Sequence, residues 1–305
     1  MKNLNFYTLL YVDMAESRQL NGKKYSDKNR LDLFVKNACV LDKTLRLNGL
    51  GGATVLTNDS KVIENSLARI GYGLNIRKIP FSLDVPQGIR FYSAHFKIDV
   101  FNYLRGLSSE EYSILLDNDV VCLSDFSKEI YSVIKDGLPM IYYLPRYGGK
   151  EKIADARLIA PDLEWLLWCG GEFIGGRSAF FKSLYDNILK IKDNYWRVLD
   201  KLTFHIGDEV LTSIAMHNII CSRHQIVLDA GVLGLVHRYW SVFEQKPLRD
   251  VGTPLVHLPG DKVFISKIDL SGPTVEDLLS GYGLYNVLQR LKKTINDITI
   301  RVFKR

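Results

Sequence analysis

Two acidic residues follow directly after a short apolar run near the middle of the chain. Residues 112–116 are rich in β-forming side chains and end at Asp117-Asn118-Asp119; a second apolar run, residues 120–123, comes next. A short apolar run bounded by polar residues predicts a buried strand. Residues i and i+2 of an extended chain point the same way, so Asp117 and Asp119 would present two carboxylates to one small volume.

Two neighbouring carboxylates repel each other unless a cation lies between them. Oxygen ligands of this kind suit Mg²⁺ or Mn²⁺, and such ions commonly share a protein site with phosphate oxygens. The pattern therefore predicts a site for a metal ion and a diphosphate at Asp117 and Asp119. The alternative is an Asp-Asn-Asp turn, in which short polar side chains bind local backbone groups.

Length and composition set outer limits on the fold. A chain of 305 residues has room for one large α/β domain or two small ones. Its four cysteines are scattered without a C-x-x-C pair, which argues against a zinc site and fits a reducing cytosol. No signal peptide and no membrane-spanning stretch is recognisable, so we expect a cytoplasmic protein. The net charge of +6 is modest, and we expect no nucleic-acid partner.

The elements expected before the acidic motif alternate in the order β-α-β-α-β. Strands are expected over residues 6–12, 53–57 and 74–81, and apolar residues at helical spacing predict helices over 31–47 and 62–70. This alternation implies a parallel sheet of the nucleotide-binding type. The sequence has no G-x-G-x-x-G and no Walker A motif, so dinucleotide-binding and P-loop interpretations have no support.

The pattern is less regular elsewhere in the chain. We expect one helix over 92–104, a strand over 138–144, a charge-rich loop over 146–157 that acts as a lid or acceptor loop, and a strand within 219–228. The glycines of the stretch 170–176 let the backbone approach a ligand closely, although such a stretch is often only a turn.

Asp208 and Glu209 precede apolar residues at helical spacing, so both are expected in the first turn of a helix. Carboxylates at that position stabilise the helix dipole, which is a sufficient structural explanation. The functional alternative is a carboxylate that acts as a base or stabilises a developing oxocarbenium charge.

The segment YSILLDNDVVCLSDF, residues 112–126, resembles the D-x-D segment of GT-A glycosyltransferases. It is most similar to the glycogenin and lipopolysaccharide galactosyltransferase group, glycosyltransferase family 8, which also has a downstream H-x-x-G-x-x-K pattern that His257 and Gly260 match. The resemblance implies a GT-A fold, a mixed α/β sheet flanked by helices. It further implies transfer of a hexose from a nucleotide sugar, a UDP-sugar, to a glycan or lipid-linked saccharide, with retention of anomeric configuration.

The resemblance also implies a set of metal ligands. Asp117, Asp119 and His257 would hold the ion, and two carboxylates with an imidazole suit Mn²⁺ better than Mg²⁺. Lys262 would hold the diphosphate; it stands one position early in the family's spacing, so Lys267 is the alternative.

Donor and acceptor candidates follow from the same resemblance. The residues implied on the donor side are Tyr11, Val12, Asp13, Lys97, Asn118, Gly260 and Lys262. Tyr11 and Val12 are alternatively core residues, and Lys97 is alternatively a solvated surface lysine. Around the reacting centre the candidates are Asp208 and Glu209, because HIGDEVLTSIA resembles the acidic segments of the blood-group transferase family and of the glycogenin group. Glu172 is a further candidate, because in the family a strand that contacts donor and acceptor sugars lies at the position of residues 170–176.

The end of the chain, residues 284–305, places apolar side chains at helical spacing among lysines and arginines. Such a basic amphipathic helix either lies on an anionic membrane or packs on the core with a solvated basic face. We therefore expect a GT-A domain over residues 1–270 and a helical appendage over residues 271–305.

Three other functions compete with glycosyl transfer. A haloacid-dehalogenase-like phosphatase also uses D-x-D after a strand, but there the motif usually opens the domain, whereas three strands are expected before it here. A nucleotidyltransferase would share the metal site and release pyrophosphate. A non-catalytic sugar-binding protein would tolerate the substitutions Asp117→Asn and Asp119→Asn.

Overall fold

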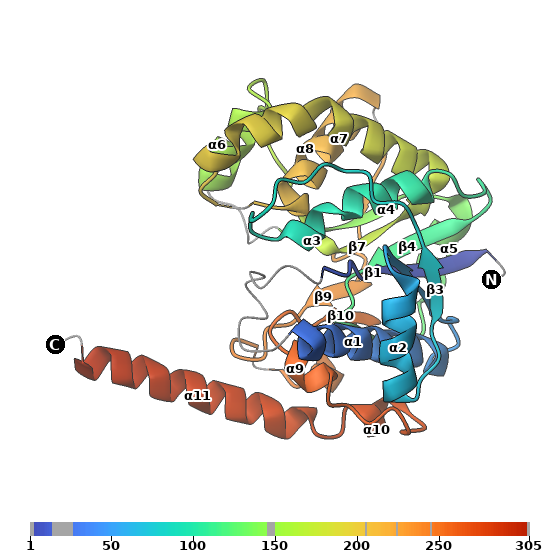
Figure 1. Ribbon diagram of the computed structural model, residues 1–305, viewed down its shortest axis with the longest axis vertical. Helices are drawn as coiled ribbons and strands as arrows, with labels where there is room; N and C mark the ends of the chain where they lie inside the picture. The colour runs from blue at the N-terminus through green and yellow to red at the C-terminus, as the bar shows by residue number, and fades with distance from the viewer. Residues whose placement is uncertain are drawn as a thin grey trace.

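A computed structural model describes residues 3–13, 27–144, 150–204, 206–223, 225–244 and 246–303. Over this range the chain forms a mixed sheet with helices on both faces (Figure 1). The mixed α/β class expected from the sequence is confirmed.

The main sheet brings the expected parallel strands together in its first half. Its strands are β1 (Leu4–Leu9), β2 (Ala53–Thr57), β3 (Asn75–Lys78), β4 (Tyr112–Leu116), β6 (Met140–Tyr143), β7 (Cys169–Arg177) and β8 (Leu228–Asp229). Their order is β3-β2-β1-β4-β7-β6-β8. Strands β3, β2, β1 and β4 are mutually parallel, whereas β7 runs antiparallel to both β4 and β6. The sheet therefore changes character at β4, whose carboxyl end precedes Asp117.

A second, three-stranded sheet holds the histidine motif beside the acidic one. It consists of β5 (Val120–Cys122), β10 (Leu255–His257) and β9 (Val236–Arg238). Strand β10 pairs antiparallel with β5, with His257 opposite Val120, and the Leu258 amide donates to the Asp119 carbonyl at 3.0 Å. This register places His257 beside Asp119, although 138 positions separate them in the sequence.

The helices cover the main sheet in two groups (Figure 1). On one face lie α3 (Tyr92–His95), α4 (Lys97–Leu104), α6 (Lys150–Ile159), α7 (Ser178–Val198) and α8 (Asp208–Arg223). On the other lie α1 (Asp27–Leu47) and α2 (Ser60–Ile70), with α9 (Lys262–Ile265) and α10 (Val275–Leu278) nearby. Helix α5 (Lys128–Asp136) follows the acidic motif; its Ser127 N-cap accepts from the Ile130 amide. Apolar side chains from both faces form the core.

Several expectations about single elements are wrong. The helix expected over 92–104 breaks at Phe96 into α3 and α4. Residues 150–159 form helix α6 rather than loop, and residues 146–149 of that expected loop lie outside the described part of the chain. The strand expected within 219–228 is absent up to residue 223, because α8 continues to Arg223. The long apolar face of that helix, Val210 to Ile219, explains why.

The described chain ends in the long helix α11 (Tyr282–Phe303), which extends away from the body of the molecule (Figure 1). Its first turn is anchored, because Tyr282 is buried with Val121 and Leu278. Among the described residues no helix is both long and apolar enough to cross a membrane.

Candidate active site

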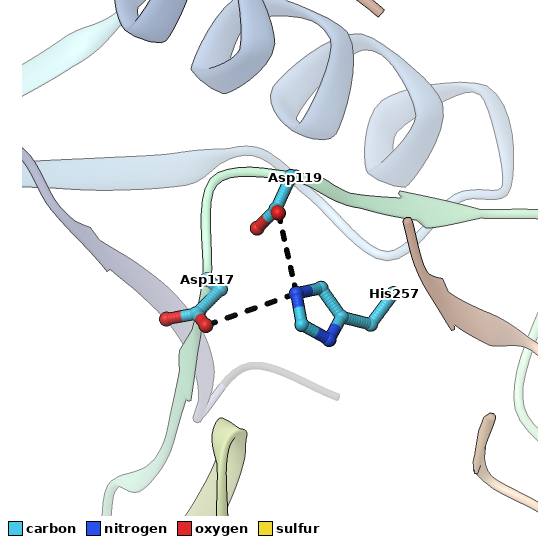
Figure 2. Close-up of side chains that lie close together, drawn as sticks. All are labelled: Asp117, Asp119 and His257. Carbon is cyan, nitrogen blue, oxygen red and sulfur yellow. Dashed lines mark ion pairs between the residues drawn. The ribbon is translucent and has the colours of Figure 1, made fainter. Parts of the chain in front are cut away.

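Asp117, Asp119 and His257 converge where β4 ends (Figure 2). One ligand atom from each residue lies within 4.8 Å of the others. The His257 Nε2 atom is 3.2 Å from Asp119 Oδ2 and 3.9 Å from Asp117 Oδ2. Asp119 and His257 are buried, while the Asp117 side chain is 28% exposed, so the cluster opens to solvent on the Asp117 side.

The donor set of this cluster fits a divalent cation. Two carboxylates and one imidazole are ligands that Mn²⁺ accepts. The buried Asp119 Oδ1 atom has no hydrogen-bond partner among the described residues, and a buried polar oxygen without a partner is energetically costly. A cation bound to that oxygen would satisfy it.

Without an ion, basic side chains neutralise the cluster. Burial alone would raise the pKa of Asp119, but the Lys262 ammonium and His257 together hold it far below its usual range. Burial alone would lower the pKa of His257, but Asp119 and Glu172 raise it to about 9. The Lys262 ammonium contacts Asp119 Oδ2 directly, whereas Lys267 is exposed, so Lys262 is the lysine that reaches the cluster.

Lys97 is buried and lies between two acidic residues of the site. Its Nζ atom is 2.8 Å from Asp117 Oδ1 and 3.0 Å from Asp208 Oδ2, and it donates to the Gly171 carbonyl at 2.9 Å. Burial opposes the ammonium charge, but Asp117 and Asp208 outweigh it and raise the pKa of Lys97. The alternative of a solvated surface lysine is therefore wrong for Lys97.

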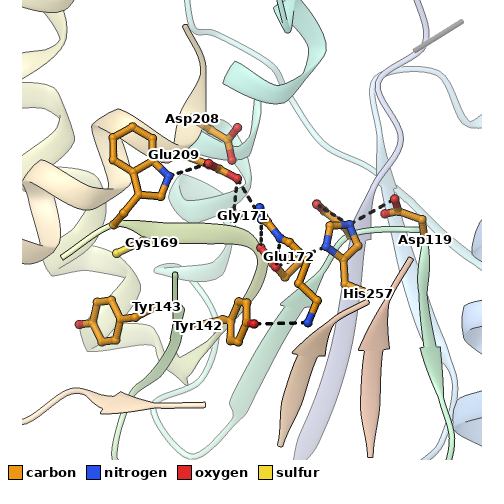
Figure 3. Close-up of polar contacts among 12 residues, drawn as sticks. Asp119, Tyr142, Tyr143, Cys169, Gly171, Glu172, Asp208, Glu209 and His257 are labelled. Carbon is orange, nitrogen blue, oxygen red and sulfur yellow. Dashed lines mark hydrogen bonds and ion pairs between the residues drawn. The ribbon is translucent and has the colours of Figure 1, made fainter. Parts of the chain in front are cut away.

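Glu172 and Glu209 are joined by an arginine that sequence reasoning missed. The Arg238 guanidinium donates to both carboxylate oxygens of Glu172, at 2.6 and 2.5 Å, and to Glu209 Oε1 at 3.2 Å. Glu209 also accepts from the Trp168 indole at 2.8 Å. Figure 3 shows Glu172 between Glu209 and His257. No short-range pattern marks Arg238 as a site residue, because its partners lie 66 and 29 positions away in the chain.

Side chains pack so closely on the backbone of Gly170 and Gly171 that a larger residue at either position would collide with them. A Cβ atom on Gly170 would lie 2.1 Å from Glu172 Oε2, and a Cβ atom on Gly171 would lie 2.5 Å from Lys97 Nζ. Charged groups therefore pack directly on the backbone of β7 at both positions. The sequence suggested that a ligand approaches these glycines closely. In the described part of the chain the side chains of Glu172 and Lys97 do so.

Asp208 and Glu209 lie in the first turn of α8, as expected, but they face different partners. Asp208 pairs with Lys97, on the side of Asp117, whereas Glu209 pairs with Arg238. The Asp208 side chain is buried, with 7% of it exposed, whereas the Glu209 side chain is 18% exposed.

The remaining candidates line the approach from β1 or the turn itself. The Tyr11 ring stacks on Phe96 with centroids 4.0 Å apart, and Val12 exchanges two backbone hydrogen bonds with the Asn58 amide. Of three further candidates, Asp13 and Asn118 are half-buried and Gly260 is exposed.

The fold of the chain is similar to that of a solved glycosyltransferase. The crystal structure of mouse xyloside xylosyltransferase 1 in its apo form has 12% sequence identity and a TM-score of 0.50, over 85% of this chain and 98% of that chain. The chain has the GT-A fold. The GT-A fold expected from the D-x-D segment is thereby confirmed.

Two structures of LgtC are also similar in outline. An active-site mutant has 10% identity and a TM-score of 0.48, and the galactosyltransferase in complex with donor and acceptor sugar analogs has 11% identity and a TM-score of 0.46. Each comparison covers 84% of this chain and 87% of the LgtC chain. Neither a protein-family model nor a curated protein matches the sequence.

Proposed function

We propose that this protein is a metal-dependent glycosyltransferase that moves a hexose from a nucleotide sugar, a UDP-sugar, to a glycan or lipid-linked saccharide. One observation carries the proposal: Asp117, Asp119 and His257 converge at the end of β4 in a GT-A fold. In open α/β sheets, ligands bind beyond the carboxyl ends of the strands. The motif resemblance to glycosyltransferase family 8 supports UDP as the nucleotide and retention as the stereochemical outcome.

We assign different parts of donor binding to different residues of the site. Asp117, Asp119 and His257 would hold Mn²⁺, or Mg²⁺, which when bound supplies a Lewis acid for the departing diphosphate. Lys262 contacts Asp119 and is free to turn toward a diphosphate oxygen once a metal ion neutralises that carboxylate. Lys97 keeps Asp117 in place through its 2.8 Å ion pair. Tyr11, Val12 and Asp13 would bind the nucleoside.

Asp208 and Glu209 are the carboxylates available to the reacting sugar. Each is held by a basic residue, Lys97 or Arg238; Asp208 is buried, and Glu209 keeps 18% of its side chain exposed. A carboxylate held in this way stabilises positive charge that develops at the anomeric carbon, or accepts the proton of an acceptor hydroxyl.

Donor hydrolysis tests the proposal. Purified protein is incubated with Mn²⁺ and a panel of nucleotide sugars, and released UDP, phosphate and pyrophosphate are measured separately. We expect slow UDP release from one donor, lost with EDTA and with Asp119→Asn. Asp125→Asn, in the same segment but bonded to Tyr131, is the matched control and should keep the activity.

The products also separate the competing functions. Phosphate released from a phosphomonoester would favour the phosphatase, and pyrophosphate would favour the nucleotidyltransferase. Absence of UDP release together with absence of metal-dependent nucleotide binding across the panel would overturn the glycosyltransferase proposal.

We further propose that the segment after residue 270 contacts an anionic membrane through α11. This helix turns polar side chains toward the body: Asn286 donates to the Tyr239 hydroxyl at 2.7 Å and Arg290 donates to the Ser241 carbonyl at 3.2 Å. Five apolar residues of its described part face solvent instead, namely Leu284, Val287, Leu288, Leu291 and Ile295, each about half exposed or more. Lysines and arginines accompany this apolar stripe in the sequence, which favours an anionic lipid surface over a neutral one.

Vesicle sedimentation tests the membrane contact. We expect binding to vesicles that contain phosphatidylglycerol, weaker binding to pure phosphatidylcholine, and loss of binding in Leu288→Glu/Leu291→Glu. Val232→Glu, an exposed apolar residue outside α11, is the control. Equal binding of the double variant and the wild type would contradict the proposal, and a concentration-dependent dimer lost in the double variant would assign the stripe to a second copy of the chain.

A further inference from the structure

Glu172 is a fully buried carboxylate at the centre of the site, and its two oxygen atoms are already engaged. Both accept from Arg238, and Oε1 also lies 3.3 Å from His257 Nδ1. Its side chain is 0% exposed. A carboxylate in this state has no free face for a sugar, so direct attack or proton transfer at the anomeric carbon does not fit it.

The same contacts fit a residue that acts indirectly, by holding other residues of the site in place. We propose that Glu172 is a positioning residue that orients His257 and joins the metal cluster to Glu209. The proposal rests on the metal-dependent function proposed above. It assigns to Glu172 no contact with substrate and no ligand bond to the ion.

The orientation of the His257 ring supports this role. Its two nitrogens face different carboxylates: Nδ1 faces Glu172, and Nε2 faces Asp119 and Asp117. A carboxylate that accepts a hydrogen bond from one ring nitrogen fixes the tautomer, so the other nitrogen presents its lone pair to a metal ion. His257 Nδ1 makes no aligned hydrogen bond within the described part of the chain, so it is the Glu172 carboxylate oxygen 3.3 Å away that would keep the proton on Nδ1 and leave Nε2 for the ion.

Glu172 holds a second ligand through its backbone. The Asp117 amide donates to the Glu172 carbonyl at 3.2 Å, which continues the pairing of β4 with β7 by one step. Glu172 is therefore tied to Asp117 by its main chain and to His257 by its side chain. Substitution of the side chain alone interrupts only the second connection.

Arg238 links Glu172 to Glu209 of α8. Its guanidinium carries one positive charge between the carboxylates of Glu172 and Glu209. Bidentate arginine–carboxylate pairs are geometrically strict, so Arg238 fixes the direction of the Glu172 carboxylate as well. Gly170 provides the space, because any Cβ atom there would collide with Glu172 Oε2.

Binding of Mn²⁺ in the presence of UDP tests the proposal without measuring turnover. Free Mn²⁺ is quantified by electron paramagnetic resonance for wild type, Glu172→Gln, Glu172→Asp and His257→Ala. Loss of a hydrogen-bonded partner of a metal ligand commonly costs about 10–100-fold in metal affinity. We expect that loss in Glu172→Gln, a larger loss in His257→Ala, and partial recovery in Glu172→Asp.

Two controls separate positioning from folding. Asp42→Asn alters another buried carboxylate that is paired with an arginine, Arg46, and should lower stability without changing Mn²⁺ affinity. The double variant Glu172→Gln/Arg238→Gln also removes the cation that loses its bidentate partner in the single variant, and it should still bind Mn²⁺ weakly.

A measurement on the wild type needs no variant to fold. With ¹⁵N-labelled histidine and Mg²⁺, the His257 ring should carry its proton on Nδ1 and none on Nε2. A proton on Nε2 would overturn the proposal, as would a folded Glu172→Gln protein whose Mn²⁺ affinity equals that of the wild type. If the wild type itself binds no Mn²⁺, the proposed function fails instead.

Discussion

Lys97 and Lys152 are two buried lysines in helices beside the same site, and their surroundings differ. Lys97, in α4, has the carboxylates of Asp117 and Asp208 within 3.0 Å, and these raise its pKa. Lys152, in α6, lies over the rings of Trp168 and Phe204, 4.2 and 4.9 Å from their centroids. Burial lowers the pKa of Lys152 to about 8, although Glu209 acts in the opposite direction.

The difference shows what keeps a buried charge in this fold. Burial by itself opposes the charged form of a lysine, and only nearby carboxylates reverse that effect. Lys97 therefore serves as a permanent cation between two acidic residues of the site. Lys152 lies against aromatic rings, which attract a cation but compensate for lost water less than a carboxylate does.

Among the variants that test the contrast between Lys97 and Lys152, Lys97→Met should lose the most unfolding free energy. The variant leaves the carboxylates of Asp117 and Asp208 without their cation, and breaking a buried ion pair costs about 3–5 kcal/mol of unfolding free energy. Urea denaturation in EDTA measures the loss. Lys182→Met, which removes an exposed lysine paired with Asp186, should change stability by about 0.5 kcal/mol or less.

A double variant sharpens the result for Lys97. Adding Asp208→Asn to Lys97→Met removes one of the two carboxylates, so part of the lost stability should return. If the double variant is as unstable as the sum of both single variants, Lys97 and Asp208 do not interact energetically, and the role assigned to Lys97 is wrong.

Substitution of Gly171 by alanine should have a smaller effect at the same place. The new Cβ atom would meet Lys97 Nζ at 2.5 Å and Asp208 Oδ2 at 2.8 Å, so the ion pair must move. Overpacking of this kind costs about 1–3 kcal/mol. Gly73→Ala is the matched control, because no atom lies within 4 Å of its Cβ position. Equal unfolding free energies for the two variants would show that Lys97 does not need the space at Gly171.

Local pattern in the sequence was sufficient for the acidic half of the site. The strand before Asp117 is a continuous apolar run, and the carboxylates follow it at the spacing that an extended chain requires. The structure also places His257 beside Asp117 and Asp119, the position that the resemblance to the H-x-x-G motif implied; its role as a metal ligand stays a prediction. Both depend on short segments whose properties are local.

The other half of the site depends on contacts between distant segments. Arg238 of β9 contacts Glu172 of β7 and Glu209 of α8 only when these two strands and this helix come together, so no short-range signal could identify it. Lys97 lies off the apolar stripe of its helix and is buried against Asp117, which follows β4, and Asp208 of α8. Helix α6 is rich in charge and was expected to be a loop; packing against α7 explains why it is helical.

The smallest expected effect concerns Lys152 and depends on pH. Its pKa in the folded protein is about 8, below the usual 10.5, so between those values the unfolded chain binds more protons than the folded one. Wild-type stability should therefore rise between pH 8 and 10.5 through this group. Lys152→Met has no such group, so it should be more stable than the wild type at pH 7, by about 1 kcal/mol after solvent screening. This advantage should vanish by pH 10.5.

Urea denaturation at intervals between pH 7 and 10.5 measures the difference, with Lys182→Met as the exposed control. An advantage that stays constant over this range would mean that the Trp168 and Phe204 rings hold the charged form of Lys152 as well as water does, and the contrast with Lys97 would then disappear.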